Sequence, residues 1–389
     1  MKLTFVSNYI NHHQIPFSDA CCRELDGEYY FIQTQPMEEE RIAMGWDREA
    51  GRLPYVREMD KEEALCRKLI LESDIAIFGW SGREDLMDEL IRRRLEAGRP
   101  VLRVSERLYR EGQWRAVSPR GLLKKYRQHT RYRKQPMCLL CAGAYVASDF
   151  HIIRAYPEKM LRFGYFPETR HYTDEQLREM KEKDGRVHIL WAGRFLPLKH
   201  PEFAVRIGGE LKREQRDFHI HMAGGGELEA ELREQVESRG LQEYVTFYGY
   251  TAPGEVRRMM EKCHIHLFTS NHLEGWGAVV NEAMNSGCAV VASGEAGAVP
   301  FLLRHGENGL IYRRDSYEEF AGLVKRLAAD RELTAGLGRE AYRTIVDLWN
   351  AEHAAAELIR FCRGLLEGRI VPAGEGPLSR APIIVPGRY

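Results

Sequence analysis

Short apolar runs alternate with amphipathic stretches along most of the chain. Apolar runs bounded by turn residues predict buried strands, and a 3.6-residue apolar period between them predicts helices that cover a sheet. Such alternation is typical of α/β proteins with parallel sheets. The predicted strands are residues 2–7, 29–33, 75–78, 101–104, 142–147, 188–191, 218–223, 245–248, 264–269, 289–292 and 309–312. The predicted helices are residues 60–72, 83–97, 201–214, 227–239, 253–262 and 317–329, with a long helix at 339–366 that kinks near Trp349.

A change of composition near residues 164–185 divides the chain into two halves. Gly164 to Glu168 reads as a turn or an extended piece, and a highly charged stretch follows before a new strand begins at Arg186. A chain of 389 residues is also too long for one compact core. We therefore predict two Rossmann-like domains facing each other across a cleft. The expected boundaries are 1–168 for the first domain, 169–185 for a linker, 186–340 for the second domain, 341–366 for a terminal helix and 367–389 for an extended or mobile tail.

The overall charge and composition exclude some classes of protein. Lys plus Arg and Asp plus Glu number 57 each, and a zero net charge argues against a dedicated nucleic-acid binder. No apolar run approaches the roughly 20 residues of a membrane-spanning helix, and the N-terminus reads as a strand instead of a secretory signal. The Cys138-x-x-Cys141 pair is open to a redox or zinc interpretation, but no second pair has metal-ligand spacing. We expect reduced, buried cysteines in a cytoplasmic protein, with Cys141 opening a buried strand.

The segment that begins at Glu274 carries the clearest chemical signal. It lies between two predicted strands, so its turn and short helix form a βαβ unit. In open α/β sheets, ligands bind where the strands end. The amides of Gly275, Gly277 and Ala278, at the N-terminus of the short helix, suit a phosphate.

Two carboxylates in this segment are spaced for a nucleotide-activated sugar. Glu282, on the second helical turn, is placed to accept hydrogen bonds from two adjacent hydroxyls, as a ribose offers. Glu274, at the mouth of the turn, is placed to hold hydroxyls of a group beyond the phosphates. A solvated helix face and a plain turn are the alternatives, but the apolar neighbours Ala283 and Met284 fit a solvated face poorly.

Three other loops are expected at the same edge of the second sheet. The loop after strand 188–191 carries Arg194 and Lys199, two cations that would neutralise a diphosphate; an ordinary basic surface loop is the alternative. Gly224 opens a glycine-rich turn that suits a close approach of backbone to ligand, and Tyr250 is placed to line a base pocket. Glu229 stands where a G-x-G-x-x-G fingerprint needs its third glycine, which argues against a dinucleotide oxidoreductase.

In combination, these motifs resemble the donor domain of the retaining glycosyltransferases with two facing Rossmann domains, the GT-B fold, and specifically family GT4. The resemblance covers residues 186–366 and rests on Gly193-Arg194 with Lys199, the glycines after Ala223, residues 245–250, the E-x7-E motif at Glu274 and Glu282, residues 308–312 and Trp349. It implies that Arg194 and Lys199 contact the diphosphate, Glu282 the ribose and Glu274 the donor sugar. It also implies that the last helix crosses back to the first domain. The expected donor contacts are Gly193, Gly224, Tyr250, Gly275, Trp276, Gly277, Ala278, Val279 and Glu282.

The first half resembles this family only in its layout. The glycine-rich loop that often follows the first strand is replaced by residues 8–16, which include His12 and His13. The histidine that often follows the strand nearest the acceptor is absent, and Glu106 lies there instead. His12, His13 and Glu106 are therefore acceptor-side candidates by position, with simple loop polarity as the alternative for the two histidines.

The resemblance implies transfer of a sugar from a nucleoside diphosphate to a hydroxyl of a saccharide or lipid-linked acceptor, with retained anomeric configuration. Arg194, Lys199 and the amides of residues 275–280 would stabilise the departing diphosphate, which would take the acceptor proton after front-face attack. No D-x-D pair occurs in the chain, so we expect no bridging metal, and no cofactor beside the nucleotide-sugar co-substrate. Synthesis of a bacterial surface polysaccharide or glycolipid is the expected setting, with UDP, GDP and ADP all open as the nucleotide.

Two further features leave alternatives open. Residues 120–134, from Arg120 to Lys134, contain seven cations and no acid, which predicts either a solvated loop or peripheral contact with anionic lipid at the inner face of the membrane. Because the first half lacks the glycine-rich loop and the histidine that this family often carries, a non-catalytic nucleotide-sugar binding subunit is a second possibility. A sugar-nucleotide epimerase or a phosphorylase on the same fold is a third.

Overall fold

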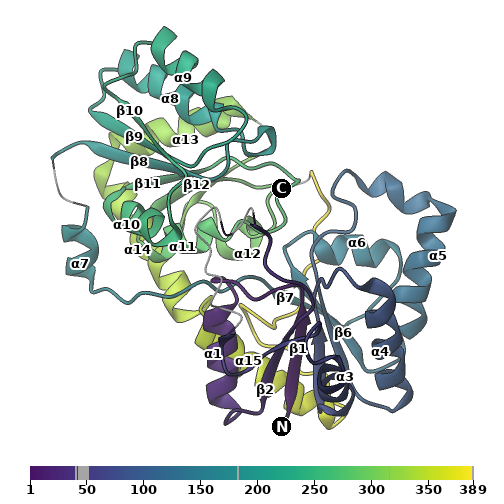
Figure 1. The fold of residues 1–389 in the computed structure, drawn as a ribbon. Coiled ribbons are helices and arrows are strands. Elements are labelled where there is room, and N and C mark those ends of the chain that lie inside the picture. Colours follow the sequence, from purple (N-terminus) through teal and green to yellow (C-terminus); the bar gives the residue numbers. More distant parts are fainter. Residues whose placement is uncertain (40–41, 43–51, 182–183, 315, 388–389) are drawn as a thin grey trace. The chain divides into compact units, whose positions relative to one another are not determined.

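The computed structural model describes residues 1–39, 42, 52–181, 184–314 and 316–387, and it divides into two compact units (Figure 1). The first unit comprises Met1–Glu168 and Trp349–Pro386, and the second contains Thr169–Leu348. Each unit is a parallel sheet covered by helices, which confirms the predicted α/β class with two Rossmann-like domains. Residues 182–183 of the predicted linker and 388–389 of the predicted tail lie outside the described part of the chain. The predicted cleft stays a prediction.

The sheet of the first unit has the order β3-β2-β1-β4-β5-β6-β7, so its chain order reverses between β1 and β4. Its strands are β1 (Leu3–Ser7), β2 (Tyr29–Gln33), β3 (Val56–Glu58), β4 (Ile75–Phe78), β5 (Val101–Ser105), β6 (Met137–Ala142) and β7 (Met160–Phe163). Its helices are α1 (Ile15–Glu24), α3 (Glu63–Glu72), α4 (Glu84–Glu96), α5 (Pro119–Gln128), α6 (Val146–Ile152) and α15 (Ala351–Leu366), with 3-10 turns η2 (Gln113–Val117) and η3 (Thr130–Tyr132).

Two helix layers cover this first sheet. Buried side chains of α3, α4 and α6, among them Ile70, Leu90 and Phe150, form one core with the strands. Helix α15 packs against α1 (Figure 1), and Trp349 stacks on Phe166 with ring centroids 6.4 Å apart. The C-terminal helix is thus built into the first unit.

The sheet of the second unit has the order β10-β9-β8-β11-β12-β13 and reverses its chain order between β8 and β11. Its strands are β8 (Val187–Ala192), β9 (Phe218–Ala223), β10 (Val245–Gly249), β11 (Ile265–Phe268), β12 (Ala289–Ser293) and β13 (Leu310–Tyr312). Its helices are α7 (Asp174–Glu179), α8 (Glu202–Arg213), α9 (Glu229–Ser238), α10 (Pro253–Lys262), α11 (Val279–Asn285), α12 (Val299–Leu302), α13 (Tyr317–Ala329) and α14 (Arg331–Asp347), with a 3-10 turn η4 (Pro197–Lys199). Apolar residues of α8, α9 and α13 form its main core against one sheet face.

Two predicted elements are wrong. The strand predicted at 142–147 is instead the end of β6 followed by α6, so Cys141 lies near the end of a strand and does not open one. The apolar run is continuous there, and only Gly143, with φ of 131°, marks the break. The long helix at 339–366 is two helices, because the side chain of Asn350 accepts a hydrogen bond from the amide of His353 and caps α15.

Residues near the C-terminus lie along the edge strand β7. The amide of Leu378 donates to the carbonyl of Arg162, and the amide of Arg162 donates to the carbonyl of Ser379, both at 2.8 Å. Leu378 is fully buried. The tail thereby covers the open edge of the first sheet, a position that otherwise invites pairing with another chain.

The cysteines and the helices bear on two expectations about location and chemistry. All eight cysteines are thiols, and burial raises the pKa of Cys138 to about 12, so the CxxC pair is unsuited to redox chemistry. In the described part of the chain, no helix combines the length and apolarity needed to cross a bilayer.

Candidate functional site

The strands β8 and β11, between which the second sheet reverses its chain order, are direct neighbours. Ligands of open α/β sheets bind at such a switch point, outside the carboxyl ends of the strands. The loop after β8 runs through Arg194 to Lys199, and the loop after β11 leads to Glu274. The structure therefore brings the predicted basic loop and the predicted acidic turn to the two sides of the switch point.

Lys199 and Glu274 form an ion pair at this switch point. The Nζ of Lys199 lies 2.5 Å from Oε2 of Glu274, and the two side chains are only 18% and 19% exposed. Burial raises the pKa of Glu274, but the charge and hydrogen bond of Lys199 outweigh it and hold that pKa below its usual value. Ser270 and Arg194 act in the same direction. Glu274 is therefore ionised at neutral pH and keeps lone pairs that can accept further hydrogen bonds.

The two loops are fixed to each other through Thr269. Its hydroxyl donates to the carbonyls of Lys199 and His200, at 2.5 and 3.0 Å, and accepts a hydrogen bond from Nε1 of Trp191 at 2.8 Å. The amide of Asn271 also donates to the carbonyl of Leu198 at 2.9 Å. These contacts position the cation of one loop beside the carboxylate of the other. The sequence contains no local signal for them.

The turn at residues 275–278 has backbone donors that no group in the described part of the chain uses. In the described ranges, the amides of Gly275, Gly277 and Ala278 donate no hydrogen bond. Gly277 has φ of 93°, and a Cβ there would lie 2.4 Å from Cζ of Phe268. Trp276 is buried, and its Nε1 donates to Oδ1 of Asn281 at 2.9 Å, which anchors the turn to α11. The predicted phosphate-binding amides are thus on a fixed turn with their donors available.

The glycine-rich turn after β9 packs directly against the loop after β8. A Cβ on Gly224 would lie 1.8 Å from the carbonyl oxygen of Gly193, and the φ of Gly224 is 137°. Tyr250, which follows β10, is 61% exposed, and its ring lies over Gly225, where a Cβ would come within 2.9 Å. Glycine is therefore required for packing at this turn, and the phenol ring beside it is open to a ligand.

Glu282 lies in the first turn of α11 and not in the second, because the helix begins only at Val279. Its amide donates to the carbonyl of Ala278 at 3.3 Å, and the residue is partly buried. The predicted contact between Glu282 and a ribose stays a prediction.

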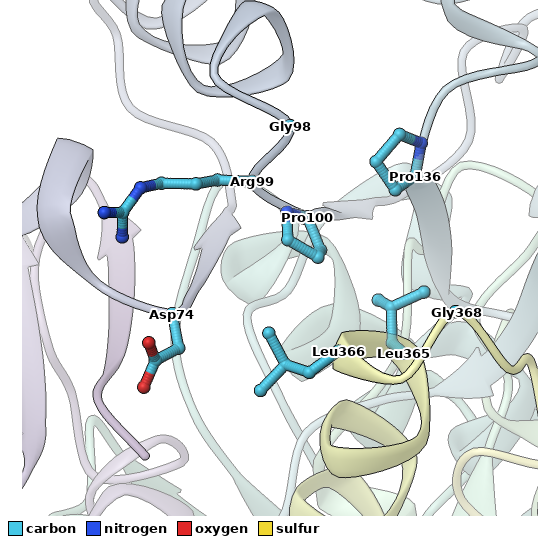
Figure 2. A pocket seen from close by; sticks show the side chains of 8 residues that line it. All are labelled: Asp74, Gly98, Arg99, Pro100, Pro136, Leu365, Leu366 and Gly368. Atoms are coloured by element: carbon cyan, nitrogen blue, oxygen red, sulfur yellow. The ribbon is translucent and has the colours of Figure 1, made fainter.

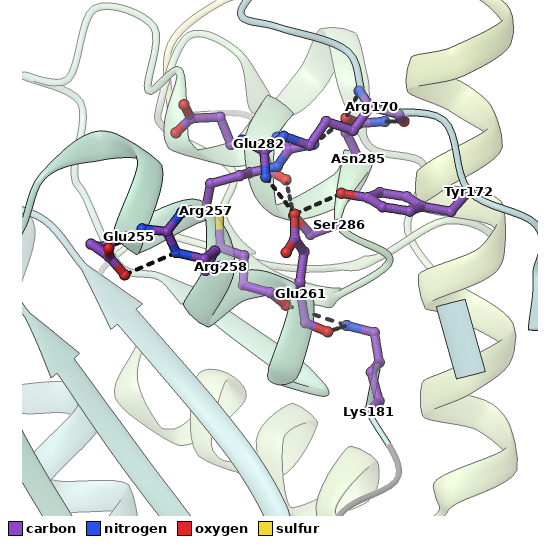
Figure 3. A network of polar contacts seen from close by, with 11 residues as sticks. Arg170, Tyr172, Lys181, Glu255, Arg257, Arg258, Glu261, Glu282, Asn285 and Ser286 are labelled. Carbon is purple, nitrogen blue, oxygen red and sulfur yellow. Dashed lines mark hydrogen bonds and ion pairs between the residues drawn. The ribbon is translucent and has the colours of Figure 1, made fainter. Parts of the chain in front are cut away.

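A polar network holds the other end of α11 (Figure 3). The side chain of Asn285 accepts a hydrogen bond from the amide of Arg170 at 2.7 Å and donates to its carbonyl at 3.0 Å, while Arg257 donates to the same amide oxygen. Glu261 accepts from Arg170 and from the hydroxyl of Tyr172, both at 2.6 Å. The segment that enters the second unit is thereby bound to α10 and α11, the helix that carries Glu282.

The acceptor-side candidates meet at the carboxyl edge of the first sheet. Glu106 follows β5 and accepts a hydrogen bond of 3.0 Å from the hydroxyl of Tyr165, which follows β7. Arg110 pairs with the same carboxylate. The ring of His13 lies 6.4 Å from that of Tyr165 and 3.8 Å from that of His12. Tyr165 was not predicted, because the strand before it was also missed.

A separate hollow of about 340 Å³ lies at the opposite edge of the first sheet (Figure 2). Asp74, Pro100 and Pro136, which line it, come just before β4, β5 and β6, and Leu365 and Leu366 close it from α15. Ligands of parallel sheets bind at the other edge, where the strands end. This hollow is therefore unrelated to the predicted site.

Comparison with known proteins agrees with this geometry. A family model described as glycosyl transferases group 1 matches residues 173–344. A GDP-mannose-dependent alpha-(1-6)-phosphatidylinositol monomannoside mannosyltransferase of Mycobacterium tuberculosis is 25% identical over 195 residues, 49% of this chain and 50% of that protein. An alpha-D-kanosaminyltransferase of Streptomyces kanamyceticus is 28% identical over 166 residues, 43% of this chain and 42% of that protein. The chain thus spans about half the length of the curated relatives it matches.

Solved structures extend the likeness to both units. Anabaena Alr3699/HepE, solved in complex with UDP, superposes on this protein with a TM-score of 0.68 at 15% identity. The match covers 92% of this chain and 100% of the Anabaena chain. A glycosyltransferase from Rickettsia africae ESF-5 has a TM-score of 0.65 at 13% identity, and the match covers 94% of this chain and 98% of the Rickettsia chain. At such identities the likeness shows the fold alone. Residues 173–344 are thus similar to the glycosyl transferases group 1 family, and the chain as a whole has two Rossmann-like domains of the GT-B type.

Proposed function

We propose that the protein is a glycosyltransferase that moves a sugar from a nucleoside-diphosphate-sugar to an acceptor hydroxyl, with retained anomeric configuration and without a metal ion. The observation that carries the proposal is the pairing of Lys199 with Glu274 at the switch point of the second sheet. One side of this point offers cations for a diphosphate, and the other offers a carboxylate for sugar hydroxyls. The family match over residues 173–344 supports the same assignment.

The proposed chemistry rests on stabilising negative charge on the leaving diphosphate. Arg194 and Lys199 would bind it from the loop after β8, with the amides of Gly275, Gly277 and Ala278 opposite. The ammonium of Lys199 has three donors, so it can keep its bond to Glu274 while it binds a phosphate oxygen. Donors fixed in advance cost no reorganisation when charge develops, which is the main source of their catalytic effect.

The remaining roles follow from position. Glu282 would accept hydrogen bonds from the two ribose hydroxyls, Glu274 would hold hydroxyls of the donor sugar, and the exposed ring of Tyr250 would line the base. On the acceptor side, Glu106 and the two histidines, His12 and His13, would orient the attacking hydroxyl. The leaving phosphate takes the acceptor proton as the new glycosidic bond forms on the face that the diphosphate leaves.

The acceptor and the cellular role are proposed only by class. A saccharide or lipid-linked hydroxyl, in the synthesis of a surface polysaccharide or glycolipid, agrees with the name of one relative, a phosphatidylinositol monomannoside mannosyltransferase. A nucleotide-sugar binding subunit without activity and a sugar-nucleotide epimerase remain the competing functions. Release of free nucleoside diphosphate only in the presence of acceptor favours transfer over both.

The first test is thermal stabilisation of the protein by UDP, GDP, ADP and NAD. A ligand at 100 times its dissociation constant adds about 2.7 kcal/mol, a readable shift in melting temperature. We expect one nucleoside diphosphate to stabilise the wild type and the control Glu255→Ala, whose carboxylate is exposed on α10, but not Glu282→Ala. A response to NAD alone, or to no diphosphate, would refute the donor site.

A further inference from the structure

One surface of the first unit exposes large apolar side chains together. Trp114 in η2 is 69% exposed, and Leu122, Leu123 and Tyr126 in α5 are 41%, 51% and 55% exposed. We call these four residues the α5 face. Single exposed apolar residues are common on proteins, but a group of them marks an interaction site.

The geometry of α5 explains why its apolar stripe faces solvent. Residues three and four apart share one face of a helix, so Leu122, Leu123 and Tyr126 lie together. The side chain of Gln128 is on the packed side, where it is buried and donates to Asp88 of α4 at 3.2 Å. Helix α5, beside α4 (Figure 1), thus packs through polar residues and presents its apolar stripe outward, the reverse of a helix that serves only the core.

Positive charge surrounds this stripe. Residues 115–134 contain eight Lys or Arg and no acidic residue. Two of the cations are balanced, since Lys124 pairs with Glu84 at 2.7 Å and Arg115 pairs with Glu111. Four exposed side chains have neither a hydrogen bond nor an ion pair with any residue that the structure describes, namely those of Arg120, Arg127, Arg133 and Lys134.

We propose that the α5 face is a docking surface for an anionic lipid bilayer. An amphipathic helix with an apolar stripe and flanking cations lies in the plane of the interface, with its apolar side chains at the acyl boundary and its cations among the headgroups. Tryptophan and tyrosine favour this boundary, since each has an apolar body and a polar tip. A nucleic acid would match the cations but would leave the Leu122–Leu123 pair without an apolar partner.

This surface is independent of the proposed donor site, because every residue in it belongs to the first unit. Under the proposed transfer reaction, docking brings the protein to a membrane that carries a lipid-linked acceptor. The two proposals fail separately: stabilisation by a nucleoside diphosphate tests the donor site, and vesicle binding tests the α5 face.

The test is co-sedimentation of the full chain with vesicles of phosphatidylcholine alone and of phosphatidylcholine with phosphatidylglycerol. We expect binding to the anionic vesicles that weakens as salt is raised, because surface charges are screened within about 8 Å at physiological ionic strength. An apolar variant, Leu122→Gln with Leu123→Gln and Tyr126→Ser, and a charge variant, Arg120→Gln with Arg127→Gln, should each lose at least about tenfold in partitioning.

The matched control is Leu65→Gln with Lys68→Gln, which changes an equally exposed leucine and a nearby exposed lysine on α3. The control should bind vesicles as the wild type does, and all variants should keep their melting temperature and their response to the nucleotide. Absence of binding to anionic vesicles at low salt overturns the proposal. Normal vesicle binding by the apolar variant also overturns the proposal. The same holds if the apolar variant abolishes self-association of the protein in the absence of lipid, since the α5 face would then bind a second copy of the chain.

Discussion

The Nζ of Lys199 lies 2.5 Å from Oε2 of Glu274, at the point where the second sheet reverses its chain order. Because both side chains are largely buried, removal of one partner leaves the other as an uncompensated charge. We expect Lys199→Met to lower the free energy of unfolding by roughly 1–3 kcal/mol. Without the lysine, burial is opposed only by Ser270 and Arg194, so the pKa of Glu274 should rise. Thermal melts of Lys199→Met, Glu274→Gln and the double variant measure the effect.

The double variant provides the control for this pair. If the two side chains stabilise the protein through their ion pair, the double variant Lys199→Met with Glu274→Gln leaves no charge unpaired. Its loss of unfolding free energy should then be smaller than the sum of the losses in the two single variants. Additive losses of unfolding free energy would show that the two side chains contribute independently and that their ion pair does not stabilise the site.

Arg194 is expected to act on the leaving diphosphate and not on the fold. Arg194→Ala should therefore lower turnover by about 10²–10³, the usual loss when one donor to a developing negative charge is removed. A matched control is Arg186→Ala, an exposed arginine at the opposite end of the same strand, β8. The measurement is the turnover number of each variant, with a sugar donor that carries the nucleoside diphosphate found to stabilise the protein. Equal turnover in both variants would place Arg194 outside the site.

Gly224 tolerates no side chain. A Cβ there would overlap the carbonyl oxygen of Gly193 at 1.8 Å, and its φ of 137° is unfavourable for any other residue. Gly224→Ala should therefore destabilise the protein by at least about 2 kcal/mol. Gly254→Ala on α10, where a Cβ meets nothing within 4 Å, should be neutral or slightly stabilising. Urea unfolding of the two variants compares them; similar midpoints would contradict the packing of the glycine turn against the β8 loop.

The sequence was sufficient to find the central strands and to place the charged loops. Buried parallel strands are continuous apolar runs, which is why 188–191 and 289–292 fall within β8 and β12. The same property produced the error at 142–147, because an apolar run without a period does not distinguish a strand from the start of α6. Loops after parallel strands share one edge of a sheet, so Lys199 and Glu274 could be assigned to the same edge.

Contacts between distant residues were beyond the sequence. The order that makes β8 and β11 neighbours is a property of the whole sheet, and the ion pair depends on it. Thr269 bonds the carbonyl of Lys199 across 70 positions, and Asn285 bonds Arg170 across 115. A threonine or asparagine carries no local signature of such a role, since the same side chains also serve as ordinary caps and turns.

The network around Asn285 predicts unequal effects at two adjacent arginines of α10. Arg257 is buried and donates to Asn285, whereas Arg258 is exposed and pairs with Glu255 (Figure 3). Arg257→Gln should cost roughly 1.5–3 kcal/mol, the contribution of hydrogen bonds to a charged group, and Arg258→Gln should cost about 0–1 kcal/mol. Thermal melts of the two variants distinguish them. If both are harmless, the network does not hold α11 in place.

Acid should destabilise the second unit through one buried and two half-buried histidines. Burial lowers the pKa of His266 to about 3, and burial together with neighbouring cations or histidines lowers those of His221 and His264 to about 3. In the unfolded chain a histidine takes up a proton below about pH 6.5, whereas these three stay neutral in the folded protein until about pH 3. Their contribution is therefore complete above pH 6.5 and is lost as the pH falls, at up to about 1.4 kcal/mol per pH unit for each histidine.

His266→Leu isolates one of these contributions. The side chain is fully buried on β11, and neither ring nitrogen has a hydrogen-bond partner among the residues that the structure describes. Replacement by an apolar residue removes two unsatisfied polar atoms, so the variant should be at least as stable as the wild type at pH 8. Between pH 6.5 and 4 its stability should fall less steeply, while His171→Leu, at an exposed position of the same unit, should leave the slope unchanged. Urea unfolding across this range gives the slope of unfolding free energy against pH for each variant. Parallel slopes for wild type and His266→Leu would show that His266 is protonated as easily in the folded protein as in the unfolded chain.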